Sequence, residues 1–354
     1  MAVRPLDKNK VRRLLVRSTN WIGDAIMTTP AVRAIRKNFP DAEISVLAKP
    51  WVAPIFESNP YTDQILIYDT HAKHKGIIGK FRVGRELKPL RFDAAILLQN
   101  AFEAAVITFI AGIPARIGFN TDGRRFLLTH AVPCKPETKK IHQTDYYLEI
   151  LRGVALETDG RHLDLVLSEA DKLRATEVLR QYGVTEKDIL VGINPSATFG
   201  PAKQWFPERF ARLSDKISES FGTRILIFGG PGDIELGKKI LHFMQQQPIN
   251  LTGMTSLGEA MALIARCNLF ITNDSGLMHV AAALDVPQVA IFGSTNSTTT
   301  GPMGSKSSTI QVPMACSPCL KPQCPDGHLN CMTLIDVDMV FEAVKGSCSS
   351  YLRG

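Results

Sequence analysis

Residues 268–293 combine a carboxylate with a turn that is suited to binding phosphate. Leu269–Thr272 is a short apolar run typical of a buried strand, and an Ala-rich helical pattern follows at 277–284. Asp274, Ser275 and Gly276 lie in the turn between them. The free amides and the dipole of a helix N-terminus favour an anion, and glycine lets a bulky group approach the backbone. The segment therefore predicts a diphosphate site with Asp274 at its edge, or, as the alternative, a simple helix cap.

A second carboxylate, Asp24, occupies the same kind of turn near the N-terminus. It follows the apolar strand pattern 13–17 and begins a helical pattern that ends before Pro40. A carboxylate that faces an enclosed site can act as a general base and take a proton from a hydroxyl group. Capping of the helix is again the alternative interpretation.

A loop at 194–205 brings hydroxyl groups and a cation to the end of another predicted strand. Ser196 and Thr198 can bind phosphate oxygens together with backbone amides, and Lys203 can supply a positive charge. The alternative is that Lys203 is only solvated. Further on, Glu235 follows the glycine-rich stretch 229–232 and is a candidate for binding a ribose hydroxyl group.

The elements that must position these residues alternate regularly between strand and helix. The predicted strands are 13–17, 43–48, 64–68, 93–98, 163–167, 189–193, 224–228, 269–272 and a last one before Gly293, with helical patterns between them. Such alternation predicts an α/β protein with two doubly wound, Rossmann-like parallel sheets facing a cleft. We expect a first domain at 1–168, a second at 169–335 with a linker region at 169–188, and a C-terminal segment 336–354 whose helix (337–348) returns to the first domain.

Composition excludes several classes of protein. The chain is 45% hydrophobic and 21% charged, as in soluble globular proteins, and no apolar run reaches the length of a membrane span. The N-terminus lacks a secretory signal, which predicts a cytoplasmic protein. Neither a G-x-G-x-x-G fingerprint nor a Walker A motif occurs, so redox and ATP-hydrolysing enzymes are disfavoured.

Positive charge is concentrated in the N-terminal part of the chain. Residues 1–150 contain 23 Lys and Arg but only 14 Asp and Glu, whereas residues 151–354 contain 18 and 20. This asymmetry predicts that the first domain meets a polyanion, such as a membrane surface, a nucleic acid or a phosphorylated substrate. A basic face without a partner remains the alternative.

Three motifs together resemble the bacterial ADP-heptose:lipopolysaccharide heptosyltransferases. They are Asn20-Trp21-Ile22-Gly23-Asp24-Ala25-Ile26-Met27, Lys203-Gln204-Trp205, and Thr272-Asn273-Asp274-Ser275-Gly276-Leu277-Met278-His279. The resemblance covers nearly the whole chain. Its cysteine-containing stretch 316–332 resembles the heptosyltransferase II members of the family rather than heptosyltransferase I.

The resemblance implies a GT-B fold and an inverting transfer of L-glycero-D-manno-heptose from ADP-heptose to a heptosyl-Kdo-lipid A acceptor in lipopolysaccharide biosynthesis. It implies that Asp24 is the general base and that Lys203 neutralises the leaving diphosphate. The donor-binding residues are then Ser196, Thr198, Glu235, Asp274, Ser275, Gly276, Leu277 and His279. For the acceptor we expect the basic cluster of Arg124, Arg125, Lys139, Lys140 and His142.

No cofactor and no metal ion are expected to be required, and the enzyme should lie peripherally at the cytoplasmic face of the inner membrane. Asp336-Val337-Asp338 has the D-x-D pattern of metal-dependent transferases, but it directly precedes a helix and is better explained as a cap. The four cysteines Cys316, Cys319, Cys324 and Cys331 are compatible with structural zinc, although reduced thiols are favoured. Alternative functions are heptosyltransferase I or III, a non-catalytic nucleotide-sugar-binding protein, and a nucleic-acid-binding protein.

Overall fold

The computed structural model describes residues 5–352 and divides the chain into two compact units, 1–166 and 167–354. Each unit is an α/β sandwich built on a six-stranded sheet in which all neighbouring strands are parallel. The division falls two residues before the boundary expected at 168. No helix within residues 5–352 is long and apolar enough to cross a membrane.

The first unit is organised around β1, which lies at the centre of its sheet. The strand order is β3-β2-β1-β4-β5-β6, the order of a Rossmann fold. The strands are β1 (Arg13–Arg17), β2 (Glu43–Ala48), β3 (Gln64–Ile67), β4 (Ala94–Leu97), β5 (Ala115–Phe119) and β6 (His130–Val132). The strands β5 and β6 were not expected from the sequence, since β5 contains Arg116 and β6 has only three residues.

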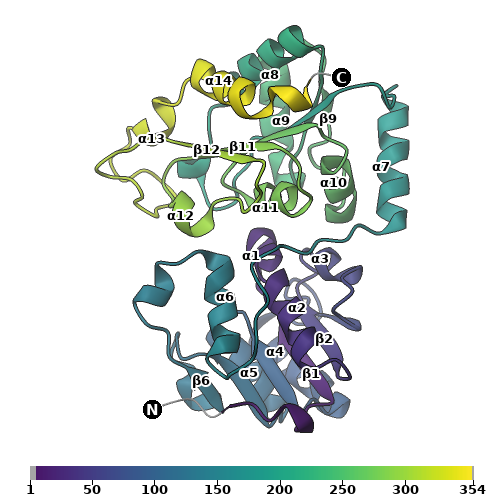
Figure 1. The fold of residues 1–354 in the computed structure, drawn as a ribbon, viewed down its shortest axis with the longest axis vertical. Coiled ribbons are helices and arrows are strands. Elements are labelled where there is room, and N and C mark those ends of the chain that lie inside the picture. Colours follow the sequence, from purple (N-terminus) through teal and green to yellow (C-terminus); the bar gives the residue numbers. More distant parts are fainter. Residues whose placement is uncertain (1–4, 353–354) are drawn as a thin grey trace. The chain divides into compact units, whose positions relative to one another are not determined.

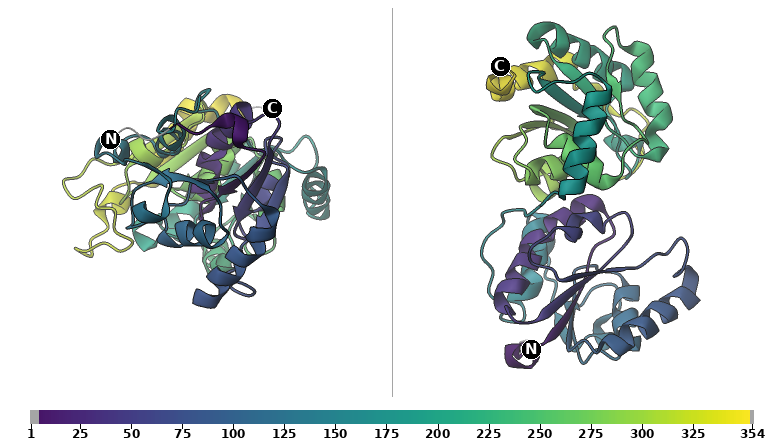
Figure 2. Two further views of the ribbon diagram at one scale, coloured as in Figure 1. Left: turned by 90° about the horizontal axis from the view of Figure 1, so that it is seen from below. Right: turned by 90° about the vertical axis from the view of Figure 1, so that its right-hand side faces the viewer.

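Helices cover both faces of this sheet, as Figure 2 shows. The helices α1, α2 and α6 contact one another, and α4 packs against α5 on the other face. The helices are α1 (Ile22–Met27), α2 (Thr29–Asn38), α3 (Pro54–Glu57), α4 (Gly76–Leu87), α5 (Phe102–Ile110) and α6 (Gln143–Arg152). Short 3-10 turns occur at Lys8–Lys10, Lys88–Leu90, Arg125–Leu127 and Glu137–Lys139.

The helical pattern that begins at Asp24 forms two helices rather than one. The break lies at Thr28, whose hydroxyl group donates a hydrogen bond of 2.6 Å to the carbonyl oxygen of Ala25. Pro30 follows in the first turn of α2, where a residue without an N–H group is tolerated but cannot continue the hydrogen bonding of α1. As a result α1 is a short helix that carries Asp24 in its first turn.

The second unit, drawn from teal to yellow in Figure 1, repeats this topology. The strand β7 lies at the centre of its sheet. Its strand order is β12-β11-β10-β7-β8-β9, which is the same Rossmann order counted from β7. The strands are β7 (Leu190–Asn194), β8 (Arg224–Ile227), β9 (Ile249–Asn250), β10 (Leu269–Asn273), β11 (Gln288–Phe292) and β12 (Ser307–Gln311).

The helices of the second unit again form two layers. One contains α8, α9 and α14, and the other contains α7, α10 and α11. Their bounds are α7 (Glu169–Gln181), α8 (Pro207–Phe221), α9 (Ile234–Phe243), α10 (Leu257–Ile264), α11 (Gly276–Ala283), α12 (Ser297–Thr300), α13 (Asn330–Thr333) and α14 (Val337–Cys348). Further 3-10 turns lie at Pro201–Lys203, Pro231–Asp233 and Ser349–Tyr351.

Two expectations about these elements are wrong. Residues 163–167 form no strand, because Asp164 directs its backbone N–H to the hydroxyl group of Thr29 rather than to a neighbouring strand. The C-terminal helix α14 does not return to the first unit but packs on α8, β11 and β12 of the second. Its apolar residues Val340 and Val344 are fully buried in the core cluster of that unit, which also contains Trp205.

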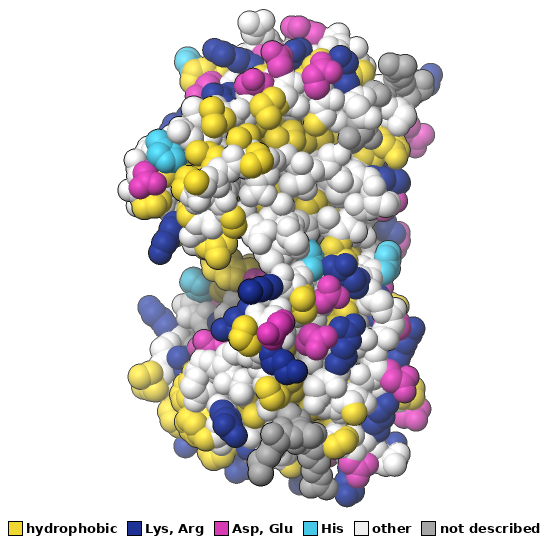
Figure 3. Space-filling model, turned by 60° about the vertical axis from the view of Figure 1, so that its left-hand side comes forward, with side chains coloured by type: hydrophobic (Ala, Val, Ile, Leu, Met, Phe, Trp, Pro, Cys, Tyr) yellow, Lys and Arg dark blue, Asp and Glu magenta, His cyan; other side chains and the backbone are white. Residues whose placement is uncertain are grey.

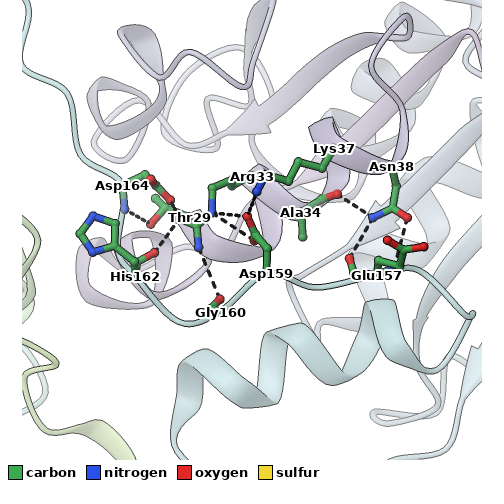
Figure 4. A network of polar contacts seen from close by, with 10 residues as sticks. All are labelled: Thr29, Arg33, Ala34, Lys37, Asn38, Glu157, Asp159, Gly160, His162 and Asp164. Atoms are coloured by element: carbon green, nitrogen blue, oxygen red, sulfur yellow. Dashed lines mark hydrogen bonds and ion pairs between the residues drawn. The ribbon is translucent and has the colours of Figure 1, made fainter.

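Arg33 on α2 binds the extended segment 157–164 that ends the first unit (Figure 4). Its Nε lies 3.1 Å from both carboxylate oxygens of Asp159, and its Nη1 donates to the carbonyl oxygen of His162 at 2.8 Å and to Asp164. The Arg33 side chain is 8% exposed. A buried cation with several acceptors therefore holds a segment that has no regular secondary structure of its own.

We predict that Arg33→Met destabilises the first unit by about 3 kcal/mol, because it removes the buried cation from two partly buried carboxylates and leaves Asp159 with only the exposed Lys37. Hydrogen exchange of peptides that cover α2 and residues 157–164 should become faster. Lys37→Met is the matched control: Lys37 also pairs with Asp159, but its side chain is 59% exposed, so its loss should cost less than about 1 kcal/mol. Equal effects of the two substitutions would contradict this account.

Candidate functional site

Three side chains from separate segments meet beyond the carboxyl ends of β10 and β11 in the second unit. The Lys203 ammonium lies 2.6 Å from Oδ2 of Asp274, and the Thr295 hydroxyl group donates to the same oxygen at 2.5 Å. The side chains of Asp274 and Lys203 are only 5% and 13% exposed. Asp274 does not cap α11, since the N-cap is Ser275. The capping alternative is thus wrong, and so is the alternative that Lys203 is merely solvated.

The arrangement can bind an anion because the ammonium of Lys203 has three N–H donors, of which the ion pair with Oδ2 of Asp274 uses one. Lys203 also lies 4.8 Å from the centre of the exposed Phe199 ring. When a phosphate group approaches, Lys203 can exchange the Asp274 carboxylate for the phosphate. The ammonium is already removed from water in the ion pair, so binding costs no further desolvation of this cation. Asp274 then becomes available to accept hydrogen bonds from hydroxyl groups.

A layer of buried polar groups holds the start of α11 in place. The Asn194 side chain at the end of β7 donates to Ser275 Oγ at 2.6 Å and to Thr272 Oγ1 at 3.1 Å. With its hydroxyl group in this network, Ser275 makes no side-chain cap bond, so the amides of the first turn, at Gly276 and Leu277, are not covered by it. Both of these residues are partly exposed. The helix N-terminus is accordingly suited to an anion.

Ser196 takes part in a second polar cluster, at the carboxyl end of β8. Its hydroxyl group donates to Asp233 Oδ1 at 2.6 Å, and the other oxygen of Asp233 accepts from the Gly230 amide at 2.7 Å. A Cβ atom on Gly229 would lie 2.8 Å from that of Asp233, so this turn requires glycine. Ser196 is therefore held by the protein itself.

The other residues that we expected to bind the sugar donor do not lie together. Thr198 is exposed on the loop after β7, and His279 is buried on α11. Glu235 is exposed and pairs at 2.8 Å with Lys238 on its own helix α9, which lowers its pKa. The structure thus brings Asp274 and Lys203 together but leaves Glu235 in a surface ion pair.

In the first unit, Asp24 accepts a hydrogen bond of 3.2 Å from the hydroxyl group of Tyr147 on α6. The N-cap of α1 is Trp21, so the capping alternative is wrong for Asp24 as well. Burial raises the pKa of Tyr147 well above its usual value, and the nearby Asp24 carboxylate adds to the shift. The phenol consequently stays protonated and acts as a fixed donor that orients the carboxylate.

Arg124 is not exposed, although the sequence suggested that it binds the acceptor substrate at the surface. It is fully buried, and its guanidinium donates to the carbonyl oxygens of Phe119 and Gln99 and to Oδ1 of Asn100. Burial lowers its pKa to about 10. His142 is the N-cap of α6 and accepts from the Thr144 amide at 3.2 Å. The exposed members of the expected cluster are Arg125, Lys139 and Lys140.

The cysteine loop contains reduced thiols in different environments. Cys316 is exposed, whereas Cys331 is buried at the start of α13, where burial and the three other thiols of the loop raise its pKa. Backbone N–H groups, foremost that of Leu329, lower the pKa of Cys324. Within residues 5–352, no group of three or more His, Cys, Asp or Glu side chains is arranged to hold a metal ion.

Asp336 accepts from the Met339 amide at 2.8 Å, as a cap of α14 does.

Sequence reasoning missed Thr295, Asn194 and Tyr147 as parts of these sites. Asn194 ends a buried strand pattern, and Thr295 lies in the loop that follows another, which is a usable signal once the strands are known to be parallel. Tyr147 lies inside a helix that the sequence analysis did not identify, 123 positions away from Asp24. Its neighbours in the sequence, Tyr146 and Leu148, give no local indication that Asp24 is its partner.

Comparison with known proteins identifies relatives over nearly the whole chain. The family model of glycosyltransferase family 9 (heptosyltransferase) matches residues 80–330. The chain is 31% identical over 317 residues to lipopolysaccharide heptosyltransferase 2 of Escherichia coli strain K12, covering 85% of this chain and 88% of the relative. It is 30% identical over 338 residues to a lipooligosaccharide heptosyltransferase 2 of Campylobacter jejuni, with coverage of 94% and 97%.

Solved structures agree with these sequence matches. A family 9 glycosyl transferase from Veillonella parvula has a TM-score of 0.87 at 28% identity and covers 99% of both chains. The ADP-heptose lps heptosyltransferase II of E. coli has a TM-score of 0.81 at 28% identity, with coverage of 96% and 99%. The resemblance drawn from the three motifs and the predicted fold class of two Rossmann-like units are confirmed.

We predict that Lys203→Met destabilises the second unit by about 3 kcal/mol, because it leaves the buried Asp274 carboxylate without its counterion. The double variant Lys203→Met/Asp274→Asn should recover part of this loss. Hydrogen exchange of peptides that cover β10 and β7 measures the effect. The control is Lys238→Met, which breaks a fully exposed ion pair and should not change exchange in these strands. A Lys203→Met variant as stable as the control would show that the pair does not stabilise the fold.

Proposed function

Since the chain belongs to glycosyltransferase family 9, the heptosyltransferase family, we propose that it transfers L-glycero-D-manno-heptose from ADP-heptose to the inner core of lipopolysaccharide. The acceptor that we propose is lipid A-Kdo bearing one heptose, so the product carries a second. Support for this position comes from the relatives named heptosyltransferase 2, which match along 84–94% of the chain at 28–31% identity.

The observation that carries the proposal is the buried ion pair of Lys203 and Asp274 beside the N-terminus of α11. ADP leaves as an anion, and its diphosphate gains negative charge as the glycosidic bond breaks. Lys203 and the amides at Gly276 and Leu277 supply positive potential for that charge. The carboxylate of Asp274, next to the cation, accepts hydrogen bonds from the hydroxyl groups of the sugar. Donor binding is thereby assigned to the second unit.

The acceptor hydroxyl group needs a base, and we assign this role to Asp24. The carboxylate takes the hydroxyl proton while the oxygen attacks the anomeric carbon and the bond to the diphosphate breaks, so the configuration inverts. The hydrogen bond from Tyr147 orients the carboxylate, and the raised pKa of the phenol keeps that donor in place. Because α1 is short and begins after β1, it presents Asp24 beyond the carboxyl end of the sheet.

A lipid-linked acceptor places the enzyme at a membrane surface, and we propose peripheral contact at the cytoplasmic face of the inner membrane. The helix α4 supports this with three exposed apolar side chains, Ile77, Ile78 and Phe81, next to Arg82 and Arg85. Figure 3 shows many further Lys and Arg side chains among the hydrophobic ones on the visible face of the first unit. An apolar strip with flanking cations suits an anionic bilayer surface.

Replacing the base tests the mechanism. We predict that Asp24→Asn lowers kcat by at least about 10³-fold, because the amide cannot accept the proton, while ADP-heptose binds as in the wild type. Tyr147→Phe keeps the carboxylate and should lower kcat only about 3- to 30-fold. Turnover is followed by ADP release, and donor affinity by calorimetry. Normal turnover of Asp24→Asn would remove this residue from the mechanism.

A series of truncated acceptors tests the proposed position of transfer. Incubation with ADP-heptose and lipopolysaccharide bearing no heptose or one heptose should extend only the one-heptose acceptor by one heptose mass, as read by mass spectrometry. Extension of the heptose-free acceptor would instead identify a heptosyltransferase I. Binding of ADP-heptose without transfer to either acceptor would support a non-catalytic nucleotide-sugar-binding protein.

A further inference from the structure

Two buried cations lie side by side at the carboxyl edge of the first sheet. Arg17 is the last residue of β1 and is fully buried, and Lys49 directly follows β2 and is 4% exposed. The two strands pair in parallel, with Arg17 opposite Leu47. This edge is also where α1 begins, the helix that carries Asp24.

Neutral groups hold both cations. The Nη2 atom of Arg17 donates to Oδ1 of Asn20 at 2.8 Å, Nη1 donates to backbone carbonyl oxygens, and Nε is buried without an acceptor in the part of the chain that the structure describes. Lys49 donates to the Thr70 hydroxyl group at 2.9 Å and lies 3.8 Å from the centre of the Tyr68 ring. Among residues 5–352, no carboxylate lies within ion-pair distance of either cation.

Two adjacent buried charges of one sign are unfavourable without a counterion. Burial lowers the pKa of Arg17 to about 10. Burial and the neighbouring Arg17 lower that of Lys49 to about 8. Two carboxylates act on these cations from beyond ion-pair distance: Glu103 acts on both and pairs with Lys80 at 3.2 Å, and Asp69 acts on Lys49. The fold thus keeps two cations without a direct ion pair at this edge, so their positive charge is only partly compensated. Such an exception to ordinary packing is typical of functional sites.

Exposed aromatic side chains lie next to these cations. The Trp51 indole donates to the Asn20 carbonyl oxygen at 2.9 Å, and its ring meets that of His71 at 5.2 Å, edge to face. The Lys49 ammonium lies 6.0 Å from the Trp51 ring. Trp21, the N-cap of α1, is 59% exposed. A large, partly exposed aromatic face fixed beside a cation suits a sugar ring that carries an acidic group.

We propose that Lys49 is the ligand in a subsite for an anionic group of the acceptor, a carboxylate or a phosphate. The fully buried Arg17 adds positive potential behind it, and Trp51 packs against the sugar that bears the anion. The identity of the acceptor rests on the proposed function, whereas the anion subsite does not. The subsite differs from the expected basic cluster, because Arg125, Lys139 and Lys140 are exposed at the surface whereas Arg17 and Lys49 are buried.

The variant Lys49→Met tests the subsite in the full-length protein. It should raise KM for the one-heptose acceptor about 10- to 100-fold, because one charged hydrogen-bond donor to the anion is lost, and leave KM for ADP-heptose unchanged. The melting temperature should stay the same or rise, since a buried like charge is removed. Lys49→Arg should recover part of the acceptor affinity. Lys75→Met, at an exposed position on the same unit, is the matched control and should change neither KM.

A purely structural role of Lys49 gives the opposite pattern, with a lowered melting temperature and an unchanged acceptor KM, and this result would overturn the proposal. Two modified acceptors distinguish the sources of the anion. Loss of affinity after reduction of the Kdo carboxyl groups to alcohols assigns a carboxylate, and loss after removal of the phosphate groups assigns a phosphate. If neither modification weakens binding to the wild type, the subsite is refuted.

Direct binding separates this inference from the proposed function. Free Kdo and inorganic phosphate are titrated into the wild type and into Lys49→Met without any donor. Weaker binding of one of them to the variant supports the subsite even if no heptose transfer is found. Equal binding of both probes to the two proteins counts against the subsite even if transfer proceeds as proposed.

Discussion

Parallel pairing of strands is the constraint on which the rest of this structure depends. In a parallel sheet the carboxyl ends of all strands lie at one edge, so residues that follow different strands become neighbours. Lys203, Asp274 and Thr295 come from three such segments and share one carboxylate oxygen. The two units have the same strand order around a central first strand, so the same rule positions Asp24 and the cations of the first sheet.

The two sheet edges differ in how they balance buried charge. In the second unit, Asp274 is the counterion of Lys203, and an incoming diphosphate would replace it as the anionic partner of that cation. In the first unit, Arg17 and Lys49 have only neutral partners, and burial lowers the pKa of both. A compensated pair is suited to a ligand that must be released as product, whereas a pair of cations without a direct counterion retains attraction for an anion that arrives from outside.

Packing separates charged residues that look alike in the sequence. Arg124 and Arg125 are adjacent in sequence and of one type, yet the first is enclosed by carbonyl oxygens and the second is exposed. Glu235 lies at the start of a helix, as a ribose ligand would, but it pairs with Lys238 one turn away. Local pattern could not separate Arg124 from Arg125, because Gln99 and Asn100, which enclose Arg124, come from another segment of the chain.

The sequence by itself determined the alternation of strands and helices, the turns that carry Asp24 and Asp274, and the family, because each depends on residues close together in the chain. It did not determine the short strand β6, the helix α6 with Tyr147, or the position of α14, whose apolar face packs on α8, β11 and β12. Tertiary structure alone decided these features and the partners of each buried charge. The physical reason is that burial and counterions come from contacts between segments distant in the chain, such as Lys203 with Asp274 and Asp24 with Tyr147, whereas propensity acts over a few residues.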